Sequence, residues 1–199
     1  MPSPTRERMV AGAADLLSRR GVHATSLRTV VQHTGTPRGS LGHHFPGGKQ
    51  ELLEEAVRYA TESVAAPLES LLQERGAVDG LRAFVGWWRR VLEKSVFEAG
   101  CPVLAVAVEP LAEEAVPDGE RPAEALRALA REAFERWESI LAAALRREGV
   151  PAVRARRLGA LIVASVEGTV AMCRAYRSAQ PLDDVQRELE AVLLGAIHP

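Results

Sequence analysis

The stretch TSLRTVVQHTGTPRGSLGHHF, residues 25–45, decides the fold of this chain. It contains two short helical segments on either side of Gly35. Thr25 is a good N-cap for the first segment, and Thr36 is a good N-cap for the second, whose first position is Pro37. Each segment has about eight residues, too few to be stable in water without tertiary support. The stretch therefore predicts a helix-turn-helix that neighbouring helices hold in place.

Helical neighbours are predicted on both sides of this pair. Apolar residues at spacings of three and four predict a helix over residues 4–20, which Gly21 ends, and a long helix begins near Lys49. In a three-helix unit of this kind, the second helix of the pair lies in the major groove of DNA, with its N-terminal residues at the base edges. The segment after Gly35 offers small and polar residues for such a contact. We therefore predict a DNA-binding head at the N-terminus.

The distribution of charge agrees with this prediction. The net charge of the 199 residues is −1, but the first 50 residues carry +5 and the remaining 149 carry −6. Four of the five histidines also lie in the basic part. A polyanion-binding head on a neutral to acidic body has this asymmetry. Charged faces that only contact solvent can produce the same uneven distribution of charge, so the charge alone does not establish a nucleic-acid partner.

The rest of the chain is also predicted to be helical, because apolar spacings of three and four recur to its end and no segment shows strand-like alternation. We expect an all-α protein of about nine helices, with one domain over residues 1–48 and a second over residues 49–199. The fourth helix is expected to kink near Pro67 and to be followed by a loop over residues 75–80. A short helix and an acidic loop are expected before a seventh helix that begins near Pro122.

The run TRERMVAGAADLLSRRGVHATSLRTVVQHTGTPRGSLGHHFPGGKQELLEEAV, residues 5–57, resembles the N-terminal domain of the TetR family of transcriptional repressors. The shared features are a helix that ends in glycine, a Thr-Ser pair, the helix-turn-helix, a His-Phe cluster and a lysine that opens the fourth helix. GSLGHHFPGGKQEL and the later GCPVLAVAVE further resemble the branch of LmrA and YxaF-like proteins. The strong match covers about a quarter of the chain.

The resemblance implies a helix-turn-helix domain that contacts double-stranded operator DNA. It places eight residues near DNA: Thr25, Ser26, Arg28, Thr36, Arg38, Ser40, His43 and Lys49. Hydroxyl groups and a lysine suit phosphates, and Arg38 is able to bind guanine O6 and N7 with two hydrogen bonds. One position departs from the family, because Gly42 stands where a tyrosine commonly contacts a DNA phosphate. The threonines are also good helix caps in the absence of DNA.

In this family the body is a ligand sensor, so residues 49–199 are expected to bind a small effector and to dimerise. A helical body rich in aromatic residues fits an apolar pocket. The candidate lining residues are Trp87, Trp88, Phe97, Cys101, Leu104, Val108, Phe134, Trp137 and Val166. Aromatic residues at helical spacing also form ordinary cores, and the adjacent tryptophans point about 100° apart on a helix.

Two carboxylates are further candidates for the effector site. Glu109 and Glu167 lie among apolar neighbours in AVAVEPL and ASVEGTV, where an unpaired carboxylate is unfavourable. Each either recognises a polar or cationic group of the effector or pairs with a neighbouring arginine.

The last two helices are predicted to form a homodimer interface. They carry more apolar surface than one domain hides, and pairing them with their copies would give a four-helix bundle. The candidate interface residues are Leu158, Leu161, Ile162, Ser165, Thr169, Met172, Leu182, Val185, Leu189 and Val192. Such a dimer sets two recognition helices about 34–36 Å apart, the spacing of successive major grooves in a palindromic site.

Together these features predict a ligand-responsive regulator, most simply a repressor that a small apolar or cationic molecule releases from DNA. A DNA-binding dimer without a ligand is the alternative, and a helical enzyme is a weaker one because no catalytic motif is present. No cofactor or metal site is expected, since Cys101 and Cys173 lie outside any metal-ligand spacing and suit reduced, buried thiols. No membrane partner is expected, because neither a signal peptide nor a run of about 20 apolar residues is present. We therefore expect a cytoplasmic protein.

Overall fold

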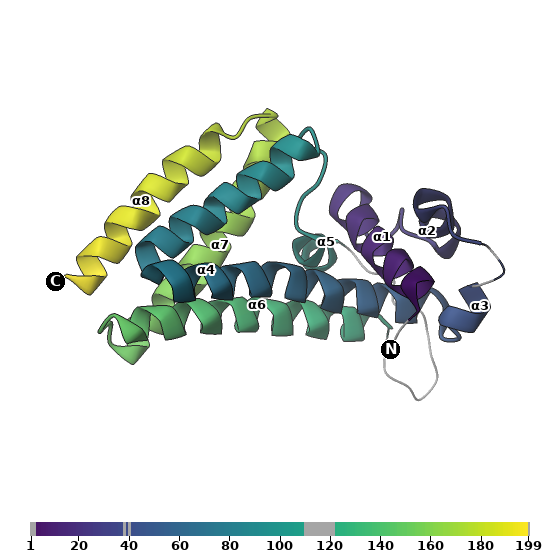
Figure 1. The fold of residues 1–199 in the computed structure, drawn as a ribbon, viewed down its shortest axis with the longest axis horizontal. Helices are drawn as coiled ribbons and strands as arrows, with labels where there is room; N and C mark the ends of the chain where they lie inside the picture. Colours follow the sequence, from purple (N-terminus) through teal and green to yellow (C-terminus); the bar gives the residue numbers. More distant parts are fainter. Residues whose placement is uncertain (1–2, 38, 40, 110–121, 199) are drawn as a thin grey trace. The chain divides into compact units, whose positions relative to one another are not determined.

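The computed structural model describes residues 3–37, 39, 41–109 and 122–198. These residues form eight α-helices and no strand, which confirms the predicted all-α class. The helices are α1 (Pro4–Arg20), α2 (Leu27–Thr34), α3 (Leu41–His44), α4 (Gly48–Lys94), α5 (Pro102–Val108), α6 (Pro122–Arg147), α7 (Ala152–Tyr176) and α8 (Gln180–Ile197). Figure 1 shows them in chain order. Of the predicted loops, the acidic one falls mostly on residues 110–121 and lies outside the described residues.

The chain forms two compact units. The first comprises Met1–Glu62 and Cys101–Ala133, and the second comprises Ser63–Gly100 and Phe134–Pro199. Both α4 and α6 contribute to each unit, so this division does not follow the predicted domain boundary at residue 48. That boundary, which concerns function, stays a prediction.

In the first unit, α1 is the central helix and packs against α2 and α5. Its apolar face is buried, with Met9 and Leu17 both 0% exposed, and Val30 of α2 is equally buried. Gly12 of α1 faces the methyl group of Thr34, which leaves no space there for a larger side chain. The short helix α2 is therefore supported by α1, as its length predicts.

Two helix caps differ from the prediction. The N-cap of α2 is Ser26, not Thr25, because Ser26 and Thr29 form a reciprocal capping box. The hydroxyl of Thr25 instead donates to the carbonyl of Gly21 at 2.7 Å. Likewise Thr36 caps none of the described helices, since its hydroxyl bonds that of Thr34 at 2.9 Å and the next described helix is Leu41–His44.

Helix α4 breaks at Gly76, not at Pro67. Gly76 has φ 79° and ψ −178°, outside the helical region, whereas the helix continues through Pro67. The predicted loop over residues 75–80 is thus reduced to one glycine, and counting the two segments of α4 separately gives the nine helices expected. The segment after the break is capped by Glu148, whose carboxylate accepts from the N–H of Ala77 at 2.5 Å.

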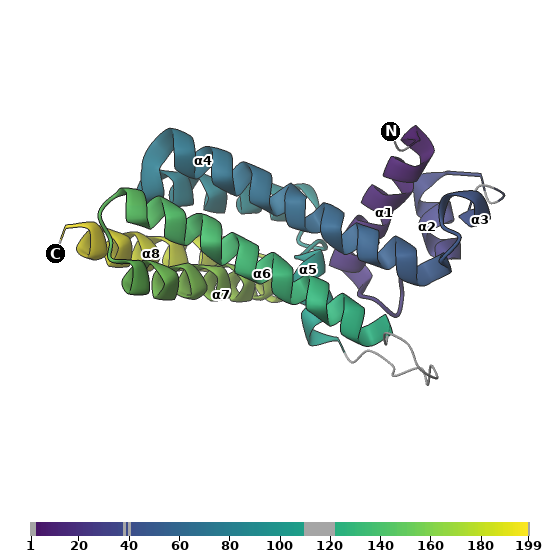
Figure 2. The same cartoon turned by 90° about the horizontal axis from the view of Figure 1, so that it is seen from below.

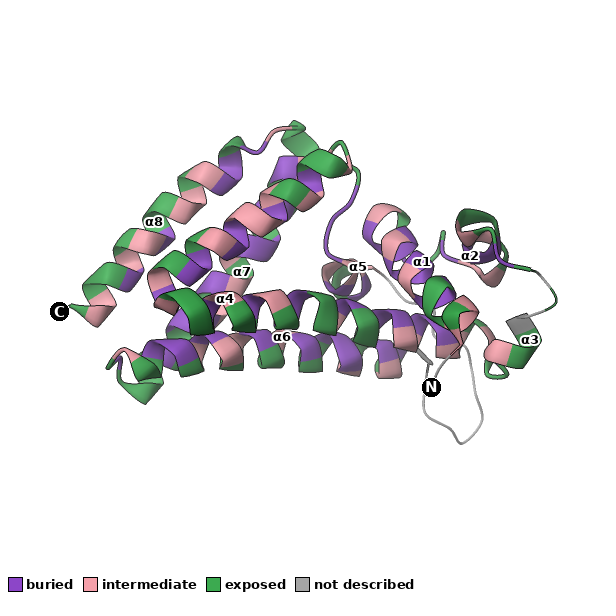
Figure 3. Ribbon diagram, viewed as in Figure 1, coloured by how far each residue is buried: buried purple, intermediate pink, exposed green. Residues whose placement is uncertain are grey.

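The second unit is built from the later part of α4 and from α6, α7 and α8. Its helices bury one face each and expose the other, as the alternation of buried and exposed residues along α6 and α8 shows (Figure 3). The largest buried side chains of this core are Trp88, Trp137, Leu81, Leu92, Leu145, Leu158 and Ile162. Helices α7 and α8 pack against each other (Figure 2).

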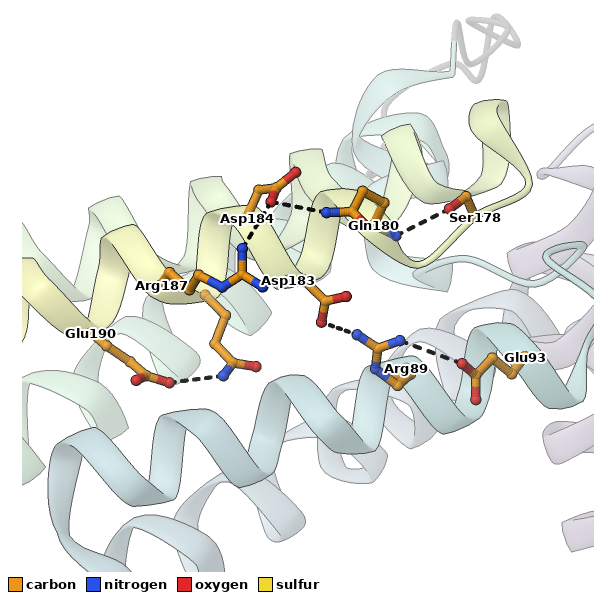
Figure 4. Close-up of polar contacts among 9 residues, drawn as sticks. Arg89, Glu93, Ser178, Gln180, Asp183, Asp184, Arg187 and Glu190 are labelled. Atoms are coloured by element: carbon orange, nitrogen blue, oxygen red, sulfur yellow. Dashed lines mark hydrogen bonds and ion pairs between the residues drawn. The ribbon is translucent and has the colours of Figure 1, made fainter.

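Polar contacts fix α8 to the second segment of α4 (Figure 4). Arg89 pairs with Asp183 and also lies 3.5 Å from a carboxylate oxygen of Glu93. About two turns earlier on α4, Arg82 donates to both carboxylate oxygens of Glu190, at 2.9 and 2.7 Å. Hydrogen bonds to Asp183 and Glu190 raise the pKa of Arg89 and Arg82, so both guanidinium groups stay charged.

One helix of the described residues, α7, is long and apolar enough to cross a membrane by length and composition. In its most apolar stretch, 44% of the residues are buried inside the protein. The core helix of a soluble protein has the same properties, so this single helix is only weak evidence for a membrane span. The sequence analysis predicted no membrane-spanning segment.

Candidate DNA-binding surface and effector site

Helices α2 and α3 meet the requirements of a helix-turn-helix. Gly35 ends α2 in the left-handed conformation, with φ 63° and ψ 28°, and its N–H donates to the carbonyl of Val31. Three of the predicted DNA contacts are exposed around this pair, namely Arg28, His43 and Lys49. Arg38 and Ser40 lie outside the described residues.

The other three predicted DNA contacts are hydroxyl residues that serve the local structure. Thr25 is 1% exposed and Thr36 is 5% exposed, so neither side chain presents its hydroxyl to a partner. Ser26 is half-buried and accepts from the N–H of Thr29 as the cap of α2. Burial argues against direct side-chain contacts from Thr25 and Thr36, whose hydroxyl groups instead bond within the head, to the carbonyl of Gly21 and to Thr34.

Gly42 lies on the exposed side of α3. A Cβ atom added there would meet no atom of the described residues within 4 Å. The position that carries a tyrosine in the resembling family is therefore open space in this chain, and a side chain fits without displacing a neighbour.

The turn between α1 and α2 is held from two sides. The N–H groups of Val22 and His23 donate to the two carboxylate oxygens of Glu109, at 2.5 and 2.8 Å. The carbonyl of Val22 accepts from Nζ of Lys49 at 3.3 Å. Glu109 is the C-cap of α5, so its carboxylate connects this helix to the turn between α1 and α2. We call these contacts of Glu109 and Lys49 with Val22 and His23 the turn clamp.

Glu109 was predicted from the sequence as a candidate for the effector site, but the structure places it in the turn clamp. Its carboxylate lies directly over Gly21, where any Cβ atom would collide with it. Gly21 also has φ 76°, a conformation that strains other residues. The sequence signal was a carboxylate among apolar residues, but its partners are backbone N–H groups, which no side-chain pattern reveals.

A second contact missed by the sequence analysis anchors the start of α1 on α4. Arg6 pairs with Glu55 and with Glu51, the latter at 3.2 Å, and its guanidinium lies 5.0 Å from the ring centre of Phe45. It also donates to the carbonyl of His44 at 3.2 Å. The hydrogen bonds that Arg6 donates to Glu55 and to Glu51 raise its pKa, with the larger effect from Glu55. Glu51 and Glu55 lie one helical turn apart, and this spacing is the feature of the sequence that could have predicted a shared basic partner.

The second unit contains a small apolar cavity of about 20 Å3. It is lined by Val64, Leu68, Phe84, Trp137, Leu141, Ile162, Val163, Val166 and Glu167. Three predicted effector residues, Trp137, Val166 and Glu167, thus come together here. Glu167 is only 6% exposed, so its carboxylate sits in largely apolar surroundings. A cavity of this size holds about one water molecule.

An aromatic cluster borders this cavity. Phe84 lines it and stacks on Trp87 with ring centres 5.6 Å apart, and Trp87 meets Trp88 edge to face at 5.0 Å. Trp88 is 2% exposed, and its Nε1 makes no hydrogen bond among the described residues. Phe134 packs edge to face on Trp137 at 5.6 Å.

The remaining predicted effector residues do not line the cavity. Phe97 lies in the turn after α4 with φ 60°. Cys101, Leu104 and Val108 belong to the first unit, where Cys101 caps α5 and Val108 is 70% exposed. The thiol of Cys173 is also buried, which raises its pKa.

The predicted dimer residues divide into two groups. Five are buried within the single chain: Leu158, Ile162, Thr169, Leu182 and Leu189. Leu161 and Met172 are 45% and 44% exposed, and Ser165, Val185 and Val192 are half-buried. Together with Leu194, which is 48% exposed, the second group gives α7 and α8 an apolar outer face.

Comparison with known proteins agrees with this architecture. Residues 9–56 match the bacterial regulatory proteins of the tetR family, and residues 77–188 match the C-terminal domain of LmrA/YxaF-like transcriptional regulators. The chain is 42% identical over 192 residues to the "uncharacterized HTH-type transcriptional regulator Rv0196" of Mycobacterium tuberculosis, covering 96% of this chain and 95% of the relative. It is 30% identical over 179 residues to YxaF of Bacillus subtilis, covering 89% of each.

Solved structures show the same fold. A TetR transcriptional regulator from Legionella pneumophila superposes with a TM-score of 0.78 at 21% identity, covering 96% of this chain and 97% of that one. A TetR regulator from Chloroflexus aurantiacus gives 0.73 at 28% identity, covering 96% and 94%. Both solved proteins are TetR transcriptional regulators. The chain therefore belongs to the TetR family and carries an LmrA/YxaF-like C-terminal domain.

Proposed function

We propose that this regulator is a repressor that binds a palindromic operator as a homodimer and is released by a small molecule. Residues 1–48 then act as the DNA-binding domain, and residues 49–199 sense the effector and dimerise. The observation that carries the DNA-binding part is the exposure of Arg28 and His43 on a helix-turn-helix whose buried threonines hold its backbone in place. Such a regulator works in the cytoplasm, where its operator is.

The DNA-binding part is tested by fluorescence anisotropy with the duplex immediately upstream of the protein's own gene. Arg28→Ala and Arg38→Ala should each weaken specific binding by about 1–3 kcal/mol, while Arg58→Ala on the exposed side of α4 serves as the control. Gly42→Tyr should tighten binding several-fold, because the open position admits a phenol that reaches a phosphate. Equal affinity of all four variants for this duplex would overturn the assignment.

The homodimer is supported by the apolar outer face of α7 and α8. Exposed apolar side chains such as Leu161 and Met172 are unfavourable in water unless a partner covers them. Leu161→Glu should convert the protein to a monomer in sedimentation analysis and abolish binding to a palindrome while leaving the helical content unchanged. A monomeric wild type would contradict the proposal.

The effector part rests on the buried Glu167 beside Trp137 and Phe84, since a carboxylate with aromatic neighbours suits a cationic or polar group on an apolar molecule. Pockets for such molecules are usually about 300–1,000 Å3, far larger than this cavity, so binding requires the core of the second unit to open. An effector acts only through its different affinity for the two arrangements of the dimer.

The small cavity also favours a second candidate, a DNA-binding dimer whose body is only a dimerisation module. A screen of small molecules for release of operator DNA distinguishes the two, with Glu167→Gln as the companion variant. Release that is lost in Glu167→Gln supports the sensor. If no compound changes operator affinity, but the dimer binds DNA normally, the second candidate holds.

A further inference from the structure

The body of the protein carries an unusual concentration of positive charge where α6 turns into α7. The segment RREGVPAVRARR, residues 146–157, contains five arginines and one acid. All five guanidinium-bearing residues are exposed: Arg146, Arg147, Arg154, Arg156 and Arg157. We call them the arginine corner. It lies within a part of the chain whose overall charge is negative, so composition alone conceals it.

No acid within the described part of the chain neutralises the arginine corner. The arginine ion pairs found among the described residues of the second unit involve Arg82, Arg89, Arg177 and Arg187, and none includes a corner arginine. The one acid inside the segment, Glu148, turns its carboxylate to the N–H of Ala77 and covers Gly76. This carboxylate caps the second segment of α4 and is thus committed to the fold.

The backbone beneath the corner is fixed. Gly149 has φ 90°, the N–H of Val150 donates to the carbonyl of Leu145, and that of Gly149 donates to the carbonyl of Arg146. These are the two hydrogen bonds of a Schellman turn, closed by the buried side chains of Leu145 and Val150. The corner arginines therefore flank an ordered turn, two at the end of α6 and three in the first turns of α7, so their backbone is already fixed and less entropy is lost on binding.

Helix stability explains only part of the corner. Arg146 and Arg147 lie in the last turn of α6, where positive charge is favourable. Arg154, by contrast, lies in the first turn of α7, where positive charge is unfavourable and where no acid compensates it. Arg156 and Arg157 follow in the next turn, beyond the reach of either helix end that would favour them. Helix stability therefore accounts for Arg146 and Arg147 but not for the three arginines of α7, which points to a role outside the fold.

We propose that the arginine corner is a second nucleic-acid-binding surface, which contacts the phosphate backbone without reading sequence. Guanidinium groups form paired hydrogen bonds with phosphates, and duplex DNA offers one negative charge per about 1.7 Å of its axis. A protein partner would need apolar anchors at the centre of its contact. In residues 146–157, Val153 is the exposed large apolar side chain, so the surface is electrostatic. This function goes beyond operator reading by the helix-turn-helix.

The test compares the full-length wild type with Arg154→Ala/Arg156→Ala/Arg157→Ala. Binding to a mixed-sequence duplex of about 30 base pairs is measured by fluorescence anisotropy over a series of salt concentrations. Losing three phosphate contacts should reduce the slope of log K against log salt by about 2–3 and weaken binding at least ten-fold at low salt. The control is Arg58→Ala/Arg90→Ala/Arg127→Ala, which removes three exposed arginines outside the corner and should leave the slope near that of the wild type.

Each further outcome decides the proposal. Equal slopes for the wild type and the corner variant, with equal thermal unfolding, would overturn it. Displacement of the duplex from the corner by polyglutamate at equal charge would assign the surface to acidic polypeptides instead. Affinity for the upstream duplex relative to the mixed-sequence duplex is measured in parallel, so that absence of operator recognition in both proteins counts against the proposed repressor and not against the corner.

Discussion

The two compact units reach a defined geometry by different means. In the first, α2 and α3 have 8 and 4 residues and depend on polar contacts such as the turn clamp and the Arg6 pairs. In the second, α7 and α8 have 25 and 18 residues and bury continuous apolar faces. A short helix hides too little surface to fix its own position, so single polar groups from other helices determine it. The first unit should therefore respond most to polar substitutions and the second to lost volume.

The largest expected effect is in the core of the second unit. Leu92 is 0% exposed, so Leu92→Ala removes buried methyl groups and leaves a cavity that should lower the free energy of unfolding by about 2–5 kcal/mol. Arg90→Ala on the exposed side of the same helix should change it by less than about 0.5 kcal/mol. Denaturant unfolding followed by circular dichroism measures both. Similar losses in the two variants would mean that burial does not stabilise this unit in the way described.

The next effect concerns the turn clamp. Glu109→Ala removes a charged acceptor from two backbone N–H groups and should destabilise the turn by about 1.5–3 kcal/mol, seen as faster hydrogen exchange at Val22 and His23. Glu109→Gln keeps one acceptor oxygen, so its exchange rates at Val22 and His23 should fall between those of the wild type and of Glu109→Ala. Unchanged exchange at these amides in Glu109→Ala would show that the clamp does not hold the turn.

A double-mutant cycle sharpens this test. Gly21→Ala is disfavoured in the wild type both by its φ of 76° and by the collision of the new methyl group with Glu109. In the Glu109→Ala background only the backbone strain remains, so Gly21→Ala should be less destabilising there. Additive effects would place the carboxylate away from Gly21.

Local patterns allowed much of the fold to be predicted. The bounds of α1, including its cap at Gly21, follow from the apolar spacing and from one glycine, and α6 and α7 follow in the same way. The caps of α2 and α3 were wrong because several hydroxyl residues compete for each position, and the choice depends on which hydroxyl finds a tertiary partner. The break in α4 was misplaced because a proline inside a long packed helix removes one hydrogen bond, whereas Gly76 adopts a conformation that helices exclude.

The candidate sites were less accessible from sequence. Trp137, Val166 and Glu167 meet at one cavity, but the other aromatic candidates scatter because helical spacing does not separate a core residue from a pocket residue. Glu109 was singled out for its apolar surroundings, yet its partners are main-chain groups of residues 87 and 86 positions earlier in the chain. The five arginines of the arginine corner are visible in the sequence, but only the structure shows that the carboxylate of Glu148 accepts from the N–H of Ala77 and does not pair with them.

A smaller effect is expected where α4 ends, because strain in the second unit resides in its backbone. Val96 is 62% exposed and has φ 55°, a conformation that is unfavourable for a β-branched residue. Val96→Gly should therefore raise the free energy of unfolding by about 1 kcal/mol, although part of the gain is lost to the greater freedom of the unfolded chain. Lys94→Gly, two residues earlier and still helical, should lower it by a similar amount. Destabilisation by both glycines would mean that the strain at Val96 is absent in solution.

The smallest effect is electrostatic and depends on pH. The hydrogen bond from Arg82 lowers the pKa of Glu190 below its ordinary value of 4.5. A carboxyl group with a lowered pKa in the folded state stabilises the fold above its unfolded pKa, and this contribution disappears as the pH falls through the folded value. Glu190→Gln should therefore lower the unfolding temperature slightly at pH 7, by less than the Val96 effect because surface pairs contribute little, and its difference from the wild type should shrink as the pH falls below 4.5. Glu188→Gln on the exposed side of α8 should match the wild type throughout this pH range. A difference for Glu190→Gln that persists unchanged in acid would assign its effect to packing, and Arg89–Asp183 would then remain as the ion pair that joins α8 to α4.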